Sequence, residues 1–302
     1  MQKKKKFKMP SKSRVAFNIV NYGLFGLLAF ACIYPLWYIF IYAISDPIRS
    51  AAETVIVYPL GFSLSNIEKM LQMEGIFRAI FNSVARTVLG TICTVFCCTL
   101  LGYVFTKQHF PARTFLYRMV IITMYVGGGM IPTYIVYRGY GLLNNFWVYI
   151  IPGLISAYYV ILIKTYIESI PISLEESALI DGASYLTVLT RIIFPMSKPI
   201  VATIAVYAAV GQWNAWFDNH IYNFARKELE VMQYKLYKYL NEAERIIAQM
   251  QESSSSVSLE HMITPFGLRM TVTLVTVIPI LVVYPFLQRY IIKGIMIGAV
   301  KG

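Results

Sequence analysis

The sequence predicts an all-α membrane protein with six transmembrane helices and both termini in the cytoplasm. Three observations support this fold class. The 302 residues are 57% hydrophobic and only 14% charged, whereas about 25% of residues are charged in an ordinary soluble domain. Six apolar segments approach or exceed the roughly 20 residues that a helix needs to cross the hydrocarbon. Basic residues are also in excess on one side of the resulting arrangement.

Residues 1–16, which begin MQKKKKFKMPSKSR, are expected to form a basic cytoplasmic N-terminus. The apolar run that follows is longer than the core of a secretory signal peptide and lacks a small-residue cleavage site, so we interpret it as the first membrane helix. The six predicted spans are 17–44, 82–105, 115–137, 146–163, 199–217 and 266–287.

The distribution of charge supports this topology. With both termini inside, the whole net charge of +12 lies on the cytoplasmic side, as the positive-inside rule requires. A shift by one span would destroy the asymmetry. Membrane orientation therefore explains the basic residues, and nucleic acid is not an expected partner. The cysteines lie in apolar runs and are expected to be free thiols, and no metal site is expected.

Two outer segments are long enough to form structure of their own. In 45–81, Ser65 and Glu68 have the spacing of a capping box ahead of a short amphipathic helix. The outer loop, residues 218–265, is too long for a simple connector and contains a stretch with helical periodicity. It is either an amphipathic helix that lies on the membrane or against the spans, or a docking surface for an external partner.

The stretch SLEESALIDGASYL interrupts the apolar sequence and predicts two short helices. Ser173 and Glu176 have the spacing of a capping box. Gly182 stands where a helix end needs positive φ, Ser184 is expected to cap the second helix, and Pro195 is expected to end it. From the residues alone, this cytoplasmic helix-turn-helix is either a foot that transmits movement from a soluble partner or an elbow on the lipid headgroups.

The longer stretch EESALIDGASYLTVLTRIIFP resembles the EAA loop of binding-protein-dependent ABC importers. Ser177 replaces the usual first alanine, a change from one small residue to another. The segments GFSLSNIEKML, FNSVARTVLGT and GQWNAWFD, with the tail LQRYIIKGIMIGAVKG, are similar to carbohydrate-uptake permeases of the maltose-permease type, especially oligosaccharide permeases of Gram-positive bacteria. The resemblance implies a type I ABC importer permease fold in a domain over 17–292, which includes the EAA loop (165–198) and the outer loop, and a cytoplasmic tail over 293–302.

The resemblance also implies how such a permease is powered. The sequence has no G-x-x-x-x-G-K-[ST] loop to hold phosphates, so the chain is expected to be no enzyme and to carry no cofactor, with ATP and Mg bound by a separate ATPase. The residues implied in coupling to that ATPase are Glu175, Glu176, Ser177, Ala178, Asp181, Gly182, Ala183 and Pro195. The tail residues implied in a further ATPase contact, or else forming a free end, are Gly298, Ala299, Val300, Lys301 and Gly302.

The expected partners are a second homologous permease, two cytoplasmic ATPase subunits, an extracellular sugar-binding lipoprotein and membrane lipid. The protein is expected to be a multi-pass protein of the bacterial cell membrane.

Polar and aromatic side chains within the spans are candidates for the translocation path, or else belong to interfacial belts and packing. They are Asn82, Tyr125, Tyr134, Tyr158, Tyr159, Trp213, Asn214 and Trp216. A glycine run at 127–129 is either a close helix contact or a hinge. Two rival classes are a secondary transporter or channel that acts alone and a membrane-bound enzyme, and the sequence shows no nucleophile–base or metal cluster for the enzyme.

Overall fold

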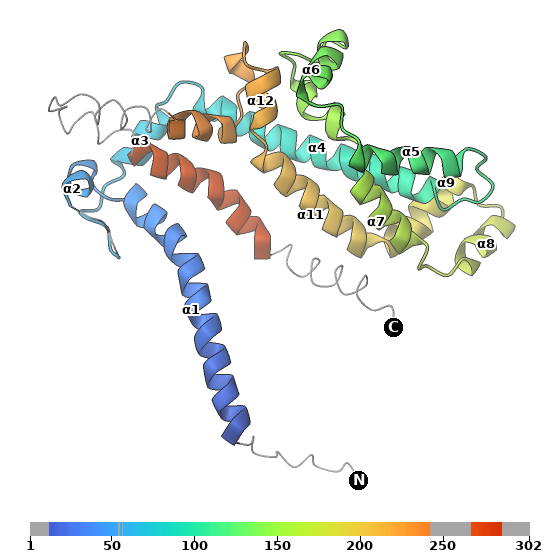
Figure 1. The fold of residues 1–302 in the computed structure, drawn as a ribbon, viewed down its shortest axis with the longest axis horizontal. Helices are drawn as coiled ribbons and strands as arrows, with labels where there is room; N and C mark the ends of the chain where they lie inside the picture. The colour runs from blue at the N-terminus through green and yellow to red at the C-terminus, as the bar shows by residue number, and fades with distance from the viewer. Residues whose placement is uncertain (1–11, 54, 56, 242–266, 286–302) are drawn as a thin grey trace. The chain divides into compact units, whose positions relative to one another are not determined.

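The computed structural model describes residues 12–53, 55, 57–241 and 267–285, and every regular element in them is helical (Figure 1). In this part of the chain the one strand-like pairing is an isolated bridge between Ser45 and Phe62. The predicted all-α class is therefore confirmed. Contacts divide the chain into two units, Met1–Met70 with Ile246–Leu274, and Leu71–Arg245 with Val275–Gly302.

The first unit is built around a long apolar helix, α1 (Lys12–Ala43). Only 6% of its most apolar window is buried, which suits a helix that faces lipid. The short helix α2 (Pro47–Ala52) follows Asp46, whose Oδ1 accepts hydrogen bonds from the amides of Ile48 at 2.9 Å and Arg49 at 3.0 Å. An aspartate cap with proline in the first helical turn is a common way to begin a helix.

The expected helix near Ser65 is present as α3 (Ser65–Leu71), but the expected capping box is wrong. Ser65 is the first helical residue rather than the cap, because the carbonyl of Leu64 already accepts the amide of Glu68 at 2.9 Å. The hydroxyl that caps this end belongs to Ser63, which accepts from the Ser65 amide at 3.2 Å.

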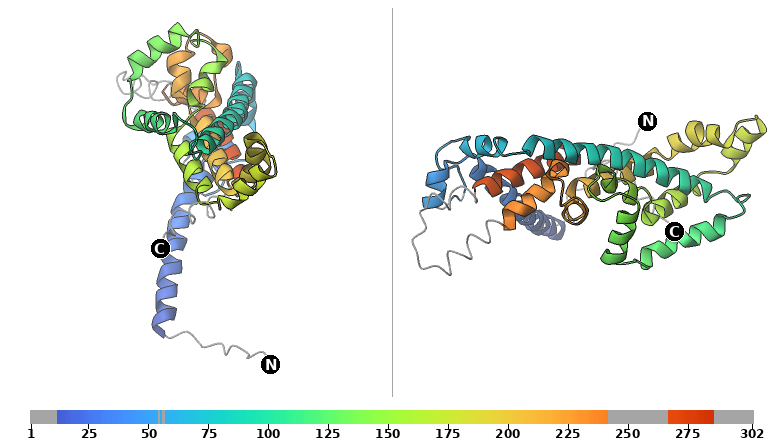
Figure 2. Two further views of the ribbon diagram at one scale, coloured as in Figure 1. Left: turned by 90° about the vertical axis from the view of Figure 1, so that its right-hand side faces the viewer. Right: turned by 90° about the horizontal axis from the view of Figure 1, so that it is seen from above.

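The second unit is organised around α4 (Ile76–Val104), which packs along both α7 (Ala157–Ile167) and α11 (Lys198–Asn214), as Figure 2 shows from two sides. Buried apolar side chains from these three helices, among them Cys98, Val160, Ile163 and Ile204, form its main core together with residues 188, 189 and 193. The remaining elements are α5 (Arg113–Tyr125), α6 (Met130–Gly139), η1 (Phe146–Tyr149), η2 (Ile151–Gly153), α8 (Ser173–Ile180), α9 (Tyr185–Val188), η3 (Leu189–Ile193), α10 (Phe194–Met196), α12 (Phe217–Tyr222), η4 (Lys227–Leu229) and a helix over 232–241. The helix Gly267–Pro285 has residues in both units.

Two glycines of α4 allow this close packing. A Cβ at Gly90 would lie 2.7 Å from the side chain of Gln212 on α11, and one at Gly102 would lie 2.7 Å from Ile163 on α7. Small residues at such contacts let helices approach closely in membranes, where van der Waals packing drives helix association.

Three helices in the described residues are long and apolar enough to cross a membrane: α1, α4 and Gly267–Pro285. Two bent pairs pass the same test together, Phe146–Gly153 with α7 at 44°, and Tyr185–Met196 with α11 at 81°. The described helices thus provide three spans, or up to five if each bent pair is one span. Six spans and cytoplasmic termini remain predictions.

The predicted span that is missing from this count is 115–137, where a continuous helix was expected. This segment forms two helices, α5 and α6, separated by residues 126–129, and α6 turns away from the line of α5 (Figure 1). Val126 is extended, with φ −114° and ψ 105°, and Gly129 has φ +77°. The glycine run therefore breaks the helix, and it forms no close contact with another described helix, because a Cβ at Gly127 or Gly129 would meet no atom within 4 Å.

Candidate functional site

The first helix that lies wholly within the EAA loop is α8, and its predicted capping box is wrong. Ile172 already has helical angles, φ −61° and ψ −28°, whereas a capping residue is extended. The Ile172 carbonyl accepts the amides of Glu175 and Glu176, both at 3.0 Å. Ser173 therefore lies inside the first turn, where its hydroxyl cannot act as the cap.

The predicted turn at Gly182 is confirmed. Gly182 has φ +84°, its amide donates to the Leu179 carbonyl at 3.0 Å, and the next amide, of Ala183, donates to Ala178 at 2.9 Å. This pair of bonds is a Schellman motif, which satisfies the last carbonyls of a helix. Ser184 then caps α9 as predicted, since its Oγ accepts from the Thr187 amide at 3.2 Å.

The prediction that Pro195 ends the second helix is wrong. Phe194, the residue before it, keeps helical angles of φ −61° and ψ −46°, and the helix continues to Met196. The residues before Phe194 form a π-helix, η3, and the Phe194 amide donates to Leu189. The wider π turn accommodates a proline that would clash in a regular α-helix. The chain then bends by 81° into α11.

The residues implied in coupling divide between two faces of the EAA loop. Ala178 and Ala183 pack against the main core. Glu175 is held by an ion pair with Lys107, just after the end of α4, and by the Tyr103 hydroxyl, which donates to it at 3.4 Å. These contacts fasten α8 to α4.

The opposite face of the EAA loop is exposed and partly apolar. Glu176, Ser177, Asp181 and Gly182 are exposed, as are the side chains of Ile180, at 85%, and Leu186, at 67%. No atom lies within 4 Å of a Cβ placed at Gly182. An apolar face next to carboxylates on a rigid turn is typical of a protein-binding surface.

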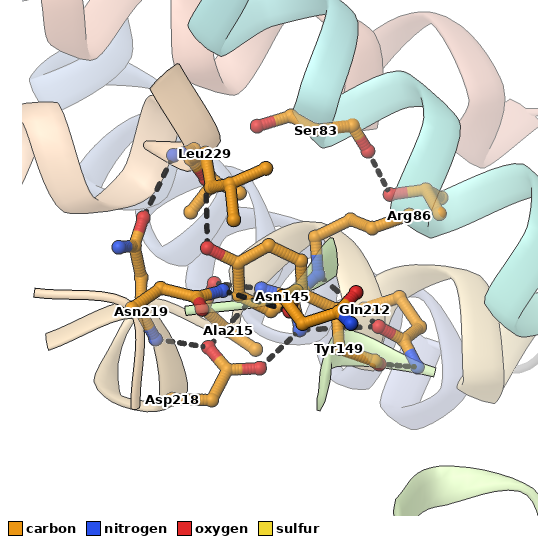
Figure 3. A network of polar contacts seen from close by, with 12 residues as sticks. Ser83, Arg86, Asn145, Tyr149, Gln212, Ala215, Asp218, Asn219 and Leu229 are labelled. Atoms are coloured by element: carbon orange, nitrogen blue, oxygen red, sulfur yellow. Dashed lines mark hydrogen bonds and ion pairs between the residues drawn. The ribbon is translucent and has the colours of Figure 1, made fainter. Parts of the chain in front are cut away.

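A network of polar contacts surrounds Arg86 of α4 (Figure 3). The Arg86 side chain is only 2% exposed. Its guanidinium donates to the Gln212 Oε1 at 3.2 and 3.1 Å, to the Ala215 carbonyl at 3.1 Å, and to both carboxylate oxygens of Asp218. These bonds use all five guanidinium N–H groups. The Tyr149 ring lies 4.4 Å from the guanidinium carbon. Arg86 thereby joins α4 to the end of α11 and the start of α12.

The sequence carried a signal for this network that the prediction did not use. An arginine within an apolar span is rare and usually has a partner inside the protein, and Arg86 lies in the quoted segment FNSVARTVLGT. The partner, Asp218, is 132 residues further along the chain, so no local pattern links the two.

The same half of α4 also fastens the beginning of the outer loop. The Asn82 amide donates to the carbonyls of Glu228 at 2.8 Å and Glu230 at 2.9 Å, and Ser83 accepts from the Met232 amide at 2.8 Å. These bonds agree with a loop that packs against the spans. Residues 242–265 of the outer loop, like the tail residues 298–302, lie outside the described residues.

The residues predicted for the path differ in their contacts. Asn82 holds the outer loop, the Trp213 indole donates to the Thr276 carbonyl at 2.9 Å, and Trp216 stacks on Tyr237 with 4.1 Å between ring centroids. Of the others, Tyr125 is 82% and Tyr158 49% exposed, Tyr134 stacks on Tyr222, and Asn214 accepts from Gln233.

Tyr159, one of the eight residues predicted for the translocation path, lines a cleft of about 330 Å³ beside the Arg86 network. Tyr137, Tyr222, Gln212 and Asp218 also line it. Burial, and then the charge of Asp218, raises the pKa of Tyr222 above its ordinary value, so its hydroxyl stays protonated. In the described residues no group of three or more His, Cys, Asp or Glu side chains could hold a metal ion.

The structure has the features of a membrane transport component: long apolar helices, two bent helix pairs, and an exposed helical turn in the EAA loop. The family of binding-protein-dependent transport system inner membrane components matches residues 98–217. Protein LplC of Bacillus subtilis (strain 168) is 32% identical over 294 residues, 97% of each chain. The chain therefore belongs to this family, and it is the permease subunit of an ABC importer rather than an enzyme.

Two further similarities concern transporters with stated substrates. The polygalacturonan/rhamnogalacturonan transport system permease protein YtcP of Bacillus subtilis (strain 168) is 31% identical over 292 residues, 95% of this chain and 98% of that protein. A chain in a crystal structure of a bacterial ABC transporter involved in the import of the acidic polysaccharide alginate is 28% identical, with a TM-score of 0.81 and coverage of 94% of this chain and 99% of that one.

Proposed function

We propose that this chain and a second, homologous permease form the path through which an ABC importer takes up an oligosaccharide. Similarity over 95% of the chain to a polygalacturonan/rhamnogalacturonan permease supports a saccharide, and the structural likeness to a component of an alginate importer agrees with it. The proposal includes six spans over the domain 17–292, both termini in the cytoplasm of a bacterial cell, and an extracellular binding lipoprotein that delivers the saccharide to the outer side.

The observation that carries the coupling role is the exposed face of the EAA loop. We place Glu176, Ser177, Asp181 and Ile180 in contact with one of two cytoplasmic ATPase subunits, which bind ATP and Mg, so that this chain needs no cofactor. Exposure of all four side chains supports this contact, and the tail over 298–302 is proposed as a second contact to the ATPase.

The local geometry supports transmission of movement through the chain. The Schellman turn holds α8 and α9 in a fixed relation, and Tyr185–Met196 leads into α11 through the 81° bend. The other end of α11 carries Gln212, which binds Arg86. Closure of the ATPase dimer would therefore displace α11 together with the polar network at its far end. The Lys107–Glu175 ion pair would carry the same displacement to α4.

The test is made in proteoliposomes that contain the complete transporter. Gly182→Val should reduce ATP-coupled uptake, because a β-branched residue resists φ +84°, while nothing within 4 Å obstructs the new side chain. Gly182→Asn is the matched control, since asparagine tolerates this conformation. The uptake probes are trigalacturonate, trigalactose and arabinotriose.

A crosslink from Ser177→Cys to the ATPase should form in the same complex. Uptake of the probes by vesicles that lack the ATPase and carry only an ion gradient would contradict the proposal. Equal ATP-coupled uptake by the Val and Asn variants would contradict the role of the turn.

A further inference from the structure

The cleft beside Arg86 is lined by three tyrosines whose hydroxyls have no hydrogen-bond partner among the described residues. Tyr137 of α6, Tyr159 of α7 and Tyr222 of α12 all line it and are half-buried. No hydrogen bond from these three hydroxyls is found to any described residue, and none of them is a buried unsatisfied atom. Each is therefore available to a molecule in the cleft.

The aromatic faces are arranged as a corner. The rings of Tyr137 and Tyr222 meet edge to face, with centroids 5.0 Å apart and an angle of 61°. Because Tyr137 and Tyr222 come from different helices, the corner exists only in the folded protein. The volume of about 330 Å³ lies at the small end of the range for ligand sites, which are mostly aromatic or apolar with a few placed polar groups.

The charges in the cleft are already paired. All five N–H groups of Arg86 are occupied by Gln212, Ala215 and Asp218, so Arg86 has no donor left for a ligand carboxylate. The Asp218 Oδ1 accepts from Arg86 and from the Asn219 amide, and Oδ2 accepts from Arg86, so Oδ2 keeps one lone pair that can accept from a hydroxyl group. A carboxylate placed here would meet the Asp218 carboxylate without a free cation.

We infer that this cleft is a saccharide contact site within this subunit, and that it binds the hydroxyl-bearing part of a sugar ring rather than a carboxylate. The inference rests on the proposed function. The C–H faces of the ring pack on the corner of Tyr137 and Tyr222, and ring hydroxyls exchange hydrogen bonds with the three phenols and with Asp218. The carboxylates of an acidic saccharide lie outside the cleft.

The experiment measures binding of tritiated probes to the purified, assembled transporter by equilibrium dialysis, without the binding protein. The probes are trigalacturonate and trigalactose, which differ only at C6 of each ring, where trigalacturonate has a carboxylate and trigalactose has a hydroxymethyl group. Tyr137→Phe, Tyr159→Phe and Tyr222→Phe each remove one oxygen and should raise the Kd about two- to tenfold, by the same factor for both probes. Tyr140→Phe, at a tyrosine of the same region that is 79% exposed, should leave the Kd unchanged.

The outcomes separate the inference from the proposed function. A triple variant that binds both probes as the wild type does, while ATP-driven uptake by the wild type is intact, would overturn the inference alone. A Kd that rises only for trigalacturonate would also overturn it, because the cleft would then bind carboxylates. A wild-type transporter that takes up none of the uptake probes with ATP would overturn both. Melting curves of the three variants verify that each is folded.

Discussion

Loss of the Asp218 charge should strongly destabilise the protein, because it leaves Arg86 charged and buried. Breaking a buried ion pair from one side costs about 3–5 kcal/mol. Arg86 is 2% exposed but Asp218 is 23% exposed, so the lower limit, about 3 kcal/mol, applies. Asp218→Asn keeps the shape of the side chain, yet its amide group presents N–H donors to a guanidinium that needs acceptors.

The magnitude translates into a measurable shift of the thermal midpoint. With an unfolding entropy of about 2.1 cal/mol/K per residue, 3 kcal/mol corresponds to about 5 °C for a chain of this length. The assay is the thermal unfolding of the purified complex in detergent, followed by tryptophan fluorescence. The double variant Arg86→Met with Asp218→Leu should recover part of the loss, since no buried charge remains, while Gln212 and Ala215 still lack their donor.

The matched control is Glu168→Gln, which breaks the ion pair with Lys164, 2.6 Å long, one helical turn apart and with Glu168 46% exposed. Exposed pairs of this kind contribute about 0.3–0.5 kcal/mol, so the midpoint should move by less than about 1 °C. If Asp218→Asn melted as close to the wild type as this control does, the reasoning about the buried arginine would be refuted.

Three further outcomes follow from local contacts. Glu175→Gln should weaken the contact with Lys107 by about 1.5–3 kcal/mol, visible as faster hydrogen exchange of the α8 amides, and unchanged exchange would speak against the ion pair. Gly102→Val should lower the yield of folded protein, because even a Cβ there would come within 2.7 Å of α7, whereas Gly139→Val, with nothing within 4 Å, should not; equal yields would refute the close packing. Ser184→Ala should cost about 1 kcal/mol of stability and Ser184→Asp much less, as thermal unfolding will show; equal losses would refute the cap.

The sequence predicted those features that depend on one residue and its backbone. Gly182 was expected at a positive φ and has φ +84°, and Ser184 was expected to cap a helix and does. In both cases the physical requirement is local: freedom from a Cβ at one position, and a hydroxyl oxygen within reach of an amide three residues later.

The predictions failed where the conformation or partner of a residue depends on other parts of the structure. Ser173 matches a capping box, but Ile172 already adopts helical angles, so the helix begins earlier. Pro195 disfavours a regular helix, yet the π turn before it accommodates the ring. The Arg86 network was not predicted, because its partners are more than 120 residues away in the sequence and only the fold brings them together.

The separation between Arg86 and Asp218 has a consequence for how the protein is made. A ribosome that adds about 5–20 residues each second needs roughly 7–26 s to reach Asp218 after it has incorporated Arg86, because 132 residues separate them. Throughout that interval α4 carries a cation without its counter-ion near the outer end of the predicted span 82–105, where a long arginine side chain can reach the membrane interface. The nascent helix can therefore insert with Arg86 at the boundary with water before the second half of the chain arrives.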